Sequence, residues 1–374
     1  MDKKRIVICG GHLAPALAVI QILQCHKNYE IFYIGRKNAA EGDRTDSLEY
    51  LTLKELKIPF YSITSSRFQR SITRYTIPSL IKFPIALLQS YYFLYRIKPN
   101  IVLSFGGYIA LPVCLAAYCL KIPVITHEQT HIMGFANRII SRFAQMACLS
   151  WSDTQKIPRE ARTVFIGNPI RKEIISSSAA KVPDFGNKKL PVIYITGGSL
   201  GSQSINKLIG EELSYLTKRF RIIHQCGSSN AEKDFKMLTR LKEVLPKESR
   251  KNYWLVCHVS PSEVGSILHC ADLIICRSGA NTVTEIAAVG TPAILLPLPW
   301  AADNEQNLNA KMLEKSGAAI IIHQEEMIKE ELKENIELMI GNLSYYRQKA
   351  RSLRKLIETD AARLLVEKVE LYLS

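Results

Sequence analysis

Residues 192–202 read VIYITGGSLGS, and this stretch decides the fold class of the 374-residue chain. Its first five residues are apolar, β-branched or aromatic, which predicts a short buried strand. The glycines and serines that follow predict a tight turn, and the apolar spacing of residues 205–213 predicts a helix. A strand that leads through a glycine turn into a helix is the repeating unit of parallel α/β sheets.

The same alternation of β-rich and helical segments runs along the chain in two series. We predict two doubly wound α/β domains, residues 1–168 and residues 169–345, and a C-terminal helix, residues 346–374, that packs back toward the first domain. A stretch of little periodicity, residues 176–189, reads as a linker or surface loop. The predicted strands are residues 5–9, 30–34, 101–104, 124–127, 146–149 and 164–166, then 192–196, 221–224, 253–256, 273–276, 293–296 and 319–322.

Two glycine turns in the second series are candidate phosphate sites. Gly198 and Ser199 follow one predicted strand, and Ser278 and Gly279 follow another, each just before a helix. Glycines let a backbone approach an anion closely, and a helix N-terminus offers unpaired N–H groups. Neither turn matches the dinucleotide or P-loop fingerprint, so a plain β–α connection is the competing interpretation of each.

Two titratable residues are candidates for chemistry. Glu285 lies in the helix after the second glycine turn, where a carboxylate can accept hydrogen bonds from both hydroxyls of a vicinal diol. His12 follows the first strand and Gly10-Gly11, where a histidine can serve as a general base. A solvated carboxylate and an ordinary polar loop residue are the competing interpretations.

The charge of the chain predicts a polyanionic partner. Lys and Arg number 49 against 34 Asp and Glu, a formal charge of +15. Between Glu55 and Glu128 there is no acidic residue, whereas eight basic residues, Arg67, Arg70 and Arg74 among them, alternate with aromatic and aliphatic ones. This stretch is either the solvated face of an amphipathic helix or a docking surface for an anionic membrane.

Other features exclude several classes of protein. Residues 101–120 are uncharged, but Gly106-Gly107 and Pro112 break them into a strand and a helix rather than a membrane span. The nine cysteines form no C-x-x-C pair and lie mostly in apolar runs, so we expect buried thiols in a reducing cytoplasm. No metal-binding motif occurs, and we expect no metal or other cofactor.

Taken in order, several motifs resemble those of the MurG family of bacterial transferases, in glycosyltransferase family 28. The first loop is shorter than the G-G-T-G-G-H usual in this family, which makes the chain a divergent member. The matching segments are Gly10-Gly11-His12 and residues 105–108 (FGGY), 127–129 (HEQ), 167–171 (GNPIR), 197–201 (GGSLG), 276–279 (CRSG) and 306–310 (QNLNA).

The resemblance implies a GT-B fold, in which two Rossmann-like domains face each other across a cleft. It implies an inverting transfer of N-acetylglucosamine from UDP-N-acetylglucosamine to the C4 hydroxyl of a polyprenyl-diphosphate-linked N-acetylmuramyl pentapeptide. That reaction converts lipid I to lipid II in peptidoglycan synthesis, and so serves cell-wall growth, cell shape and cell division. The enzyme would attach peripherally to the cytoplasmic face of the bacterial membrane, without an essential metal.

The resemblance also implies a role for individual residues. His12 would be the base, and Gly10 and Gly11 would cradle the acceptor's diphosphate. On the donor side, Arg171 and Ser199 would contact the diphosphate, and Glu285 would bind the ribose hydroxyls. Gln306 would contact the sugar. So would Thr130, which stands where the family usually has Asn.

Two alternatives stay open at this point. One is a related GT-B transferase that uses another UDP-sugar or a glycolipid acceptor, which the short first loop and Thr130 motivate. The other is a non-enzymatic basic protein that binds a membrane or nucleic acid. No nucleic-acid motif accompanies the positive charge, so nucleic acid is not an expected partner.

Overall fold

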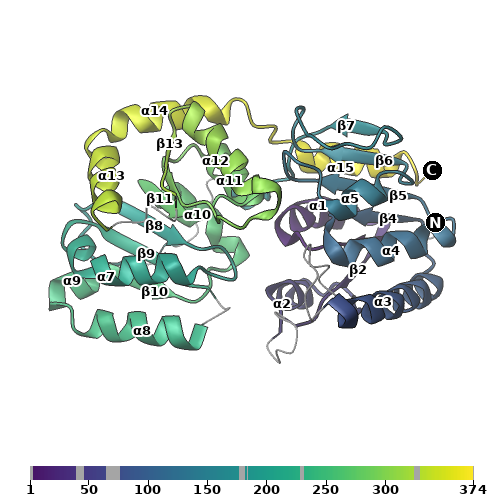
Figure 1. The fold of residues 1–374 in the computed structure, drawn as a ribbon, viewed down its shortest axis with the longest axis horizontal. Helices are drawn as coiled ribbons and strands as arrows, with labels where there is room; N and C mark the ends of the chain where they lie inside the picture. Colours follow the sequence, from purple (N-terminus) through teal and green to yellow (C-terminus); the bar gives the residue numbers. More distant parts are fainter. Residues whose placement is uncertain are drawn as a thin grey trace. The chain divides into compact units, whose positions relative to one another are not determined.

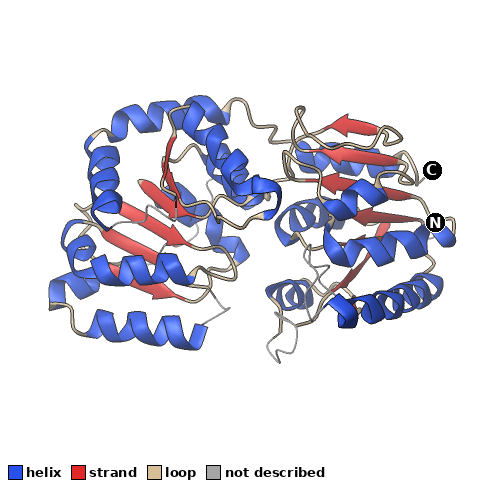
Figure 2. Cartoon of the chain, viewed as in Figure 1, coloured by secondary structure: helices blue, strands red, loops and turns tan. Residues whose placement is uncertain are grey.

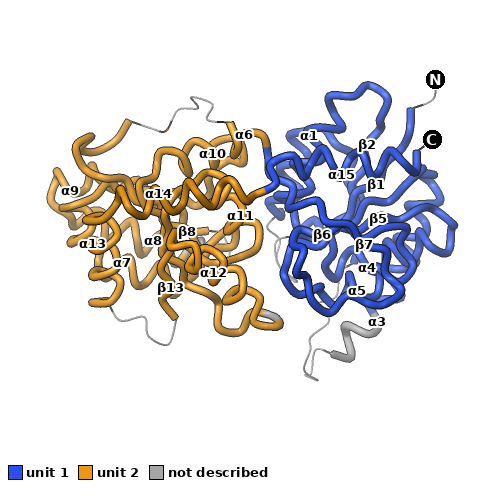
Figure 3. Tube along the Cα trace, turned by 90° about the horizontal axis from the view of Figure 1, so that it is seen from above, with its two compact units in different colours: residues 1–171, 358–374 blue, residues 172–357 orange. Residues whose placement is uncertain are grey.

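The computed structural model describes residues 3–38, 46–64, 76–176, 182, 184–227, 231–323 and 329–373. The chain forms two compact units, coloured separately in Figure 3. Unit 1 comprises Met1–Arg171 and Glu358–Ser374, and unit 2 comprises Lys172–Ile357. In each unit a parallel sheet is covered by helices (Figure 2).

Unit 1 is built on a seven-stranded parallel sheet in the order β3-β2-β1-β4-β5-β6-β7. The sequence predicted every strand except β3, a three-residue edge strand that follows Pro59 and is too short to show alternation. The strands are β1 Lys4–Cys9, β2 Tyr29–Gly35, β3 Phe60–Ser62, β4 Ile101–Ser104, β5 Val124–Glu128, β6 Met146–Leu149 and β7 Thr163–Phe165.

Alternating side chains of β1 divide the core of unit 1 between the two faces of the sheet. Ile6 and Ile8 belong to one apolar cluster, and Val7 and Cys9 belong to the other. The first cluster includes side chains from α1 Leu13–Cys25, α2 Leu48–Glu55 and α15 Ala361–Glu370. The second includes side chains from α3 Thr76–Ile97, α4 Gly107–Cys119 and α5 Phe135–Ile140.

Unit 2 is built on a six-stranded parallel sheet in the order β10-β9-β8-β11-β12-β13. Its strands are β8 Val192–Thr196, β9 Arg221–Gln225, β10 Tyr253–Val256, β11 Leu273–Cys276, β12 Ala293–Leu295 and β13 Ala319–Ile321. Its helices are α6 Lys172–Ile175, α7 Gln203–Arg219, α8 Ala231–Glu243, α9 Lys247–Lys251, α10 Pro261–Cys270, α11 Ala280–Val289, α12 Glu305–Lys315, α13 Lys329–Gly341 and α14 Leu343–Arg354 (Figure 1).

The C-terminal segment is divided between the units, which corrects the predicted grouping of residues 346–374. Helix α14 belongs to unit 2, where Arg347 pairs with Asp272 and the backbone of Ala350 passes Gly290 at the end of α11. Only the segment after Ile357 joins unit 1, where α15 packs beside α1. The two helices belong to different units because they pack on different helices. Helix α14 packs on α11, and the apolar side of α15 packs on α1.

In both sheets the strand order reverses next to the first strand of the unit. The reversal lies between β1 and β4 in unit 1 and between β8 and β11 in unit 2. Ligands of doubly wound sheets bind at the carboxyl ends of the strands at such a reversal. Glycine turns follow all four of these strands, at Gly10-Gly11, Gly106-Gly107, Gly197-Gly198 and Gly279.

The uncharged stretch 101–120 forms β4 and α4, as expected. Across the parts of the chain that the structure describes, no helix is both long enough and apolar enough to span a membrane. Arg67, Arg70 and Arg74 lie outside the described residues.

Candidate functional site

The loop after β1 is pressed against the loop after β4. Gly10 has φ +137°, and a Cβ atom placed on it would lie 2.9 Å from the carbonyl carbon of Phe105. The Gly11 N–H donates to the Gly106 carbonyl oxygen at 3.1 Å. No side chain fits at Gly10, and two turns at the reversal of the sheet are thereby held as one surface.

His12 follows this loop directly and is the N-cap residue of α1. Its side chain is half-buried and makes no capping hydrogen bond to the helix. Burial lowers the pKa of the imidazole, and the negative charge of Glu128 opposes that shift. Because the pKa is lowered from an ordinary value of 6.5, the ring is neutral at pH 7 and has a lone pair that can accept a proton.

Glu128 at the end of β5 organises the surroundings of His12. One carboxylate oxygen accepts from the Thr130 N–H at 3.0 Å and lies 2.7 Å from the Thr130 hydroxyl. The other accepts from the Gly134 N–H at 2.8 Å and the Asn137 amide at 2.9 Å. The carboxylate is 3% exposed, so these bonds replace the water that it loses.

The Thr130 side chain bonds to groups within unit 1. It is buried, and its hydroxyl lies 2.6 Å from the Ile132 carbonyl oxygen as well as close to Glu128. The acceptors of the Thr130 hydroxyl are therefore groups of the chain itself. Thr130, Glu128 and the loop of His12 lie at the carboxyl edge of one sheet. The other residues predicted to contact the UDP-sugar lie elsewhere in the chain.

His127, in the H-E-Q segment, is a buried structural histidine. Its Nε2 lies 3.0 Å from the Gly167 carbonyl oxygen, and its Nδ1 lies 3.1 Å from the Gln129 amide nitrogen. Burial lowers its pKa to about 4, so the neutral ring donates from Nε2 and accepts at Nδ1. The histidine fixes the turn at Gly167, where a Cβ atom would lie 2.7 Å from the Glu358 side chain.

The glycine turn after β8 is packed so tightly that two of its positions accept only glycine. A Cβ atom on Gly197 would lie 2.3 Å from the Ser202 nitrogen, and one on Gly201 would lie 2.0 Å from the Cys226 carbonyl oxygen. Gly198 has φ +84° with no atom within 4 Å of its Cβ position. Gly198 and the exposed Ser199 therefore form the open side of the turn, just before the N-terminus of α7.

Arg277, the residue before Ser278, links the two glycine turns of unit 2. Its guanidinium donates to the hydroxyls of Ser202 at 2.9 Å and Ser204 at 2.7 Å. It also donates to the carbonyl oxygen of Leu296 at 2.8 Å. A buried cation at the start of α7 adds positive charge beside the open turn.

Gln306 is positioned by the second glycine turn. The Ser278 hydroxyl donates to the Gln306 carbonyl oxygen at 2.8 Å, and the Asn309 amide donates to the Ser278 carbonyl oxygen at 3.1 Å. The Gln306 side-chain oxygen accepts from the Leu298 N–H at 3.0 Å. Because the amide's orientation is fixed in this way, its NH₂ group remains as the donor for a ligand.

The remaining predicted residues are placed as follows. Gly279 caps α11 with open space at its Cβ position, and the half-buried Glu285 lies in that helix. Arg171 is buried at the end of the first segment of unit 1. The structure therefore gathers Gly198, Ser199, Ser278, Gly279, Glu285 and Gln306 in unit 2, and Gly10, Gly11, His12, Thr130 and Arg171 in unit 1.

Sequence reasoning missed three residues that the geometry makes central: Glu128, Asn137 and Arg277. All three lie within or beside motifs noted in the sequence. The Ser202 and Ser204 partners of Arg277 are distant in sequence. Glu128 and Asn137 bond to each other and to other residues between 126 and 134, in a loop region that shows no periodic pattern. The nine cysteines are free, and within the described ranges no group of three His, Cys, Asp or Glu side chains is close enough to hold a metal ion.

Comparison with known families and proteins gives a consistent result. Residues 9–148 match the Glycosyltransferase family 28 N-terminal domain, and residues 192–365 match the Glycosyltransferase family 28 C-terminal domain. A protein of Clostridium tetani is 31% identical over 352 residues, covering 92% of each chain. A protein of Bacillus pumilus is 33% identical over 369 residues, covering 96% of each chain. Both are named UDP-N-acetylglucosamine–N-acetylmuramyl-(pentapeptide) pyrophosphoryl-undecaprenol N-acetylglucosamine transferase.

Solved structures agree with this result. MurG of Acinetobacter baumannii superposes with a TM-score of 0.67 at 28% identity, covering 98% of this chain and 99% of that one. The calicheamicin glycosyltransferase CalG4 gives a TM-score of 0.67 at 12% identity, with coverage of 100% and 99%. The second likeness concerns the fold alone, which is GT-B.

Proposed function

Because the chain belongs to glycosyltransferase family 28, we propose that it transfers N-acetylglucosamine from UDP-N-acetylglucosamine to an N-acetylmuramyl-(pentapeptide) pyrophosphoryl-undecaprenol acceptor. The observation that carries the proposal is the match of both units to the two halves of this family, along nearly the full length of named transferases. The product is lipid II, and the pathway is peptidoglycan synthesis.

Unit 2 is proposed to hold the donor. The open backbone at Gly198 and Gly279, each just before a helix, supports a role in binding the diphosphate. Glu285 lies in the helix that starts at Gly279 and is assigned to the ribose hydroxyls. Gln306, with its amide oxygen already engaged by Leu298, is assigned to the sugar as a hydrogen-bond donor.

Unit 1 is proposed to hold the acceptor and the base. Gly10 and Gly11 form the surface that would receive the acceptor's diphosphate, and His12 accepts the proton of the attacking C4 hydroxyl. The lowered pKa of His12 supports this role because the ring is unprotonated at neutral pH. As the proton leaves, the hydroxyl oxygen attacks the anomeric carbon, UDP departs, and the configuration inverts. Base catalysis of this kind is worth about 10²–10⁴-fold in rate.

The test is an assay of UDP release and of glycosylated lipid with UDP-N-acetylglucosamine and a lipid I analogue. The wild-type protein should form product, and His12→Ala should reduce kcat by about 10²–10⁴-fold. His26→Ala is the matched control, because His26 is exposed just after the other end of α1. Wild-type turnover no faster than that of His12→Ala would refute the proposal, and a panel of other UDP-sugars and glycolipids would then identify a related transferase.

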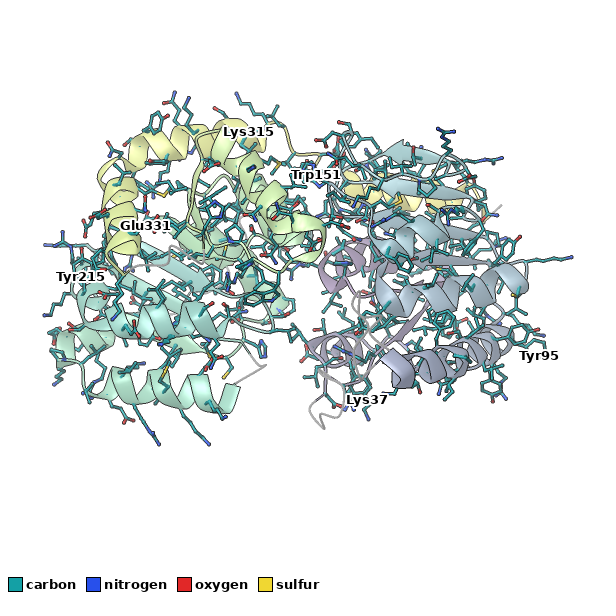
Figure 4. All side chains as sticks on the ribbon, viewed as in Figure 1. Lys37, Tyr95, Trp151, Tyr215, Lys315 and Glu331 are labelled. Carbon is teal, nitrogen blue, oxygen red and sulfur yellow. The ribbon has the colours of Figure 1, made fainter. Side chains whose placement is uncertain are left out.

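We also propose that α3 docks on the anionic cytoplasmic surface of the cell membrane, which would make the enzyme peripheral. Its exposed apolar residues recur along one side of the helix: Ile85, Leu88, Tyr91, Tyr92 and Tyr95. Leu88 is 70% exposed, and Tyr95 lies on the outer side of α3 in Figure 4. Arg96 lies over the ring of Tyr92 at 5.9 Å. An apolar stripe with basic neighbours and no acidic residue suits a bilayer of anionic lipids.

A further inference from the structure

We propose that Tyr33 and Glu49 are positioning residues for the loop that carries His12. Together they form a hydrogen-bond relay to the Gly10 carbonyl group, and the direction of the relay changes when Glu49 gains or loses a proton. The inference deepens the proposed function and rests on it, because His12 is the base of the proposed transfer.

The relay begins at the Gly10 carbonyl oxygen, two residues before His12. The Tyr33 hydroxyl lies 3.2 Å from this oxygen and 2.6 Å from the Oε1 atom of Glu49. Tyr33 is fully buried in β2, directly opposite Ile8 of β1. A tyrosine hydroxyl in such a place has no water to bond with, so these two acceptors are its partners.

The peptide of Gly10 is held from its other side as well. A Cβ atom at Gly10 would lie 2.9 Å from the Phe105 carbonyl carbon, and the next N–H, that of Gly11, donates to Gly106. The loop is therefore clamped between the turn after β4 and the hydroxyl of Tyr33. Within the described residues, the Tyr33 hydroxyl is the side-chain group that bonds to the Gly10 carbonyl oxygen, so a change at Tyr33 acts directly on the loop.

Glu49 is fixed in the first turn of α2. Ser47 caps that helix, accepting from the Tyr50 N–H at 3.1 Å and donating to the Arg36 carbonyl oxygen at 2.8 Å. The second carboxyl oxygen of Glu49 lies 3.4 Å from the Arg36 nitrogen. A Cβ atom on Gly35 would lie 2.9 Å from the same oxygen, so the carboxyl group fills a space that only glycine leaves open.

Aromatic packing holds Tyr33 at its place in the relay. The ring stacks on Phe60, with centroids 5.8 Å apart and planes at 10°. Tyr50 meets the same Phe60 edge-on at 5.2 Å. The hydroxyl of Tyr33 therefore has little freedom to turn away from Gly10 and Glu49.

One hydroxyl proton cannot serve both acceptors at once. When Glu49 is ionised, the Tyr33 O–H donates to the carboxylate, which is the stronger and nearer acceptor. The Gly10 carbonyl oxygen then loses its donor. When Glu49 is protonated, its own O–H donates to the Tyr33 oxygen, and the Tyr33 O–H donates to Gly10. The protonated state thus completes the relay and fixes the loop.

The surroundings of Glu49 let both states occur near neutral pH. Burial raises the pKa of its carboxyl group to about 7, although the Tyr33 hydroxyl and the Arg36 backbone and charge act to lower it. The Cys9 thiol of β1, which lies in the apolar cluster on the other face of the sheet, interacts electrostatically with both groups. Burial raises the pKa of that thiol, so it stays neutral. The pKa of Tyr33 is also raised by burial, so its hydroxyl keeps its proton.

The first test is amide hydrogen exchange at Gly11 in the full chain without substrates. The measurement is made at about pH 6, where Glu49 is mostly protonated and the relay is complete. Tyr33→Phe keeps the stacked ring and removes the relay, so the Gly11 amide should exchange about fivefold faster, the factor expected for one lost hydrogen bond. Tyr50→Phe is the matched control, because it removes a hydroxyl from the same aromatic cluster without touching Gly10. Equal exchange in wild type and Tyr33→Phe at this pH would overturn the proposal.

The second test is pH dependence, with Glu49→Gln as the variant. A glutamine amide donates to the Tyr33 oxygen at every pH, so it mimics the protonated relay. In the wild type, the Gly11 exchange rate, corrected for its intrinsic pH dependence, should rise about fivefold from pH 6 to pH 8. In Glu49→Gln it should stay constant. The same pH dependence in both proteins would overturn the relay.

The assay of transfer adds a readout that separates positioning from binding. Above pH 7 the wild-type kcat for the lipid acceptor should fall by about fivefold, and Glu49→Gln should not show this fall. The KM for UDP-N-acetylglucosamine should be unchanged in both. If the wild type forms no product at all, the proposed function fails, and the exchange measurements still decide the relay because they need no turnover.

Discussion

The side-chain amide of Asn137 donates a hydrogen bond to the carboxylate of Glu128 at 2.9 Å, inside unit 1. The same amide group reaches the His127 carbonyl oxygen at 3.0 Å, and its oxygen accepts from the Thr126 hydroxyl at 2.7 Å. A Cβ atom on Gly106 would lie 2.7 Å from the Asn137 nitrogen. One asparagine at the start of α5 therefore ties the end of β5 to the turn after β4, against which the loop of His12 rests.

Replacing Asn137 by alanine should destabilise the protein by about 3 kcal/mol, since a buried carboxylate and a buried hydroxyl each lose a partner. Urea unfolding of unit 1 would measure the loss. Asn28→Ala is the control, because Asn28 is an exposed loop residue whose replacement should change the free energy of unfolding by less than about 0.5 kcal/mol. Similar values for the two variants would show that the network around Glu128 contributes nothing.

Much of this arrangement could be predicted from local sequence, because parallel strands buried on both faces read as short apolar runs. The glycine turns were found for the same reason, since 197–201 and 276–279 interrupt such runs. The edge strand β3 was missed because three residues show no period. The partners of Arg277 and Tyr33 could not be found either, because they depend on which strands become neighbours. Arg277 reaches Ser202 because β8 pairs with β11, and Tyr33 meets Gly10 because β1 and β2 pair in the observed register.

Gly279→Ala should separate ligand binding from stability in unit 2. The position has an extended backbone, φ −63° and ψ 145°, with no atom within 4 Å of a Cβ, so the cost in stability should stay below about 1 kcal/mol. A methyl group at the N-terminus of α11 would nevertheless obstruct an approaching phosphate. We expect roughly tenfold weaker binding of UDP by calorimetry.

Gly201→Ala provides the contrast to Gly279→Ala. Its Cβ would lie 2.0 Å from the Cys226 carbonyl oxygen at φ +82°, so we expect a loss of stability of about 3 kcal/mol. Unchanged UDP affinity in Gly279→Ala would remove that helix end from the proposed donor site.

Leu88→Glu should weaken binding to vesicles that contain anionic phosphatidylglycerol. The substitution removes an exposed apolar side chain from α3 and adds a charge that the vesicle surface repels, so the partition coefficient should fall by roughly tenfold or more. Added salt should lower binding of the wild type as well. Leu338→Glu on α13, where the leucine is 49% exposed, should leave co-sedimentation unchanged. An equal effect of both substitutions would mean that α3 is not the docking surface.

Glu49→Gln should make the protein more resistant to unfolding at high pH but not at low pH. The folded-state pKa of Glu49 is raised to about 7, whereas an unfolded glutamate titrates near 4.3. Between these values the folded state holds a proton that the unfolded state has lost, so the wild type loses stability as the pH rises through this window. The total loss is about 4 kcal/mol, and the glutamine variant lacks it.

Urea unfolding at pH 5 and at pH 8 measures this difference, because contributions from other groups are shared by the two proteins. The stability of Glu49→Gln relative to wild type should increase between the two pH values. Glu55→Gln is the control, since Glu55 ends the same helix and is exposed, and its difference from wild type should not change with pH. If Glu49→Gln also kept a constant difference, the buried carboxyl group would be ionised at both pH values, and the Tyr33 hydroxyl would donate to it throughout.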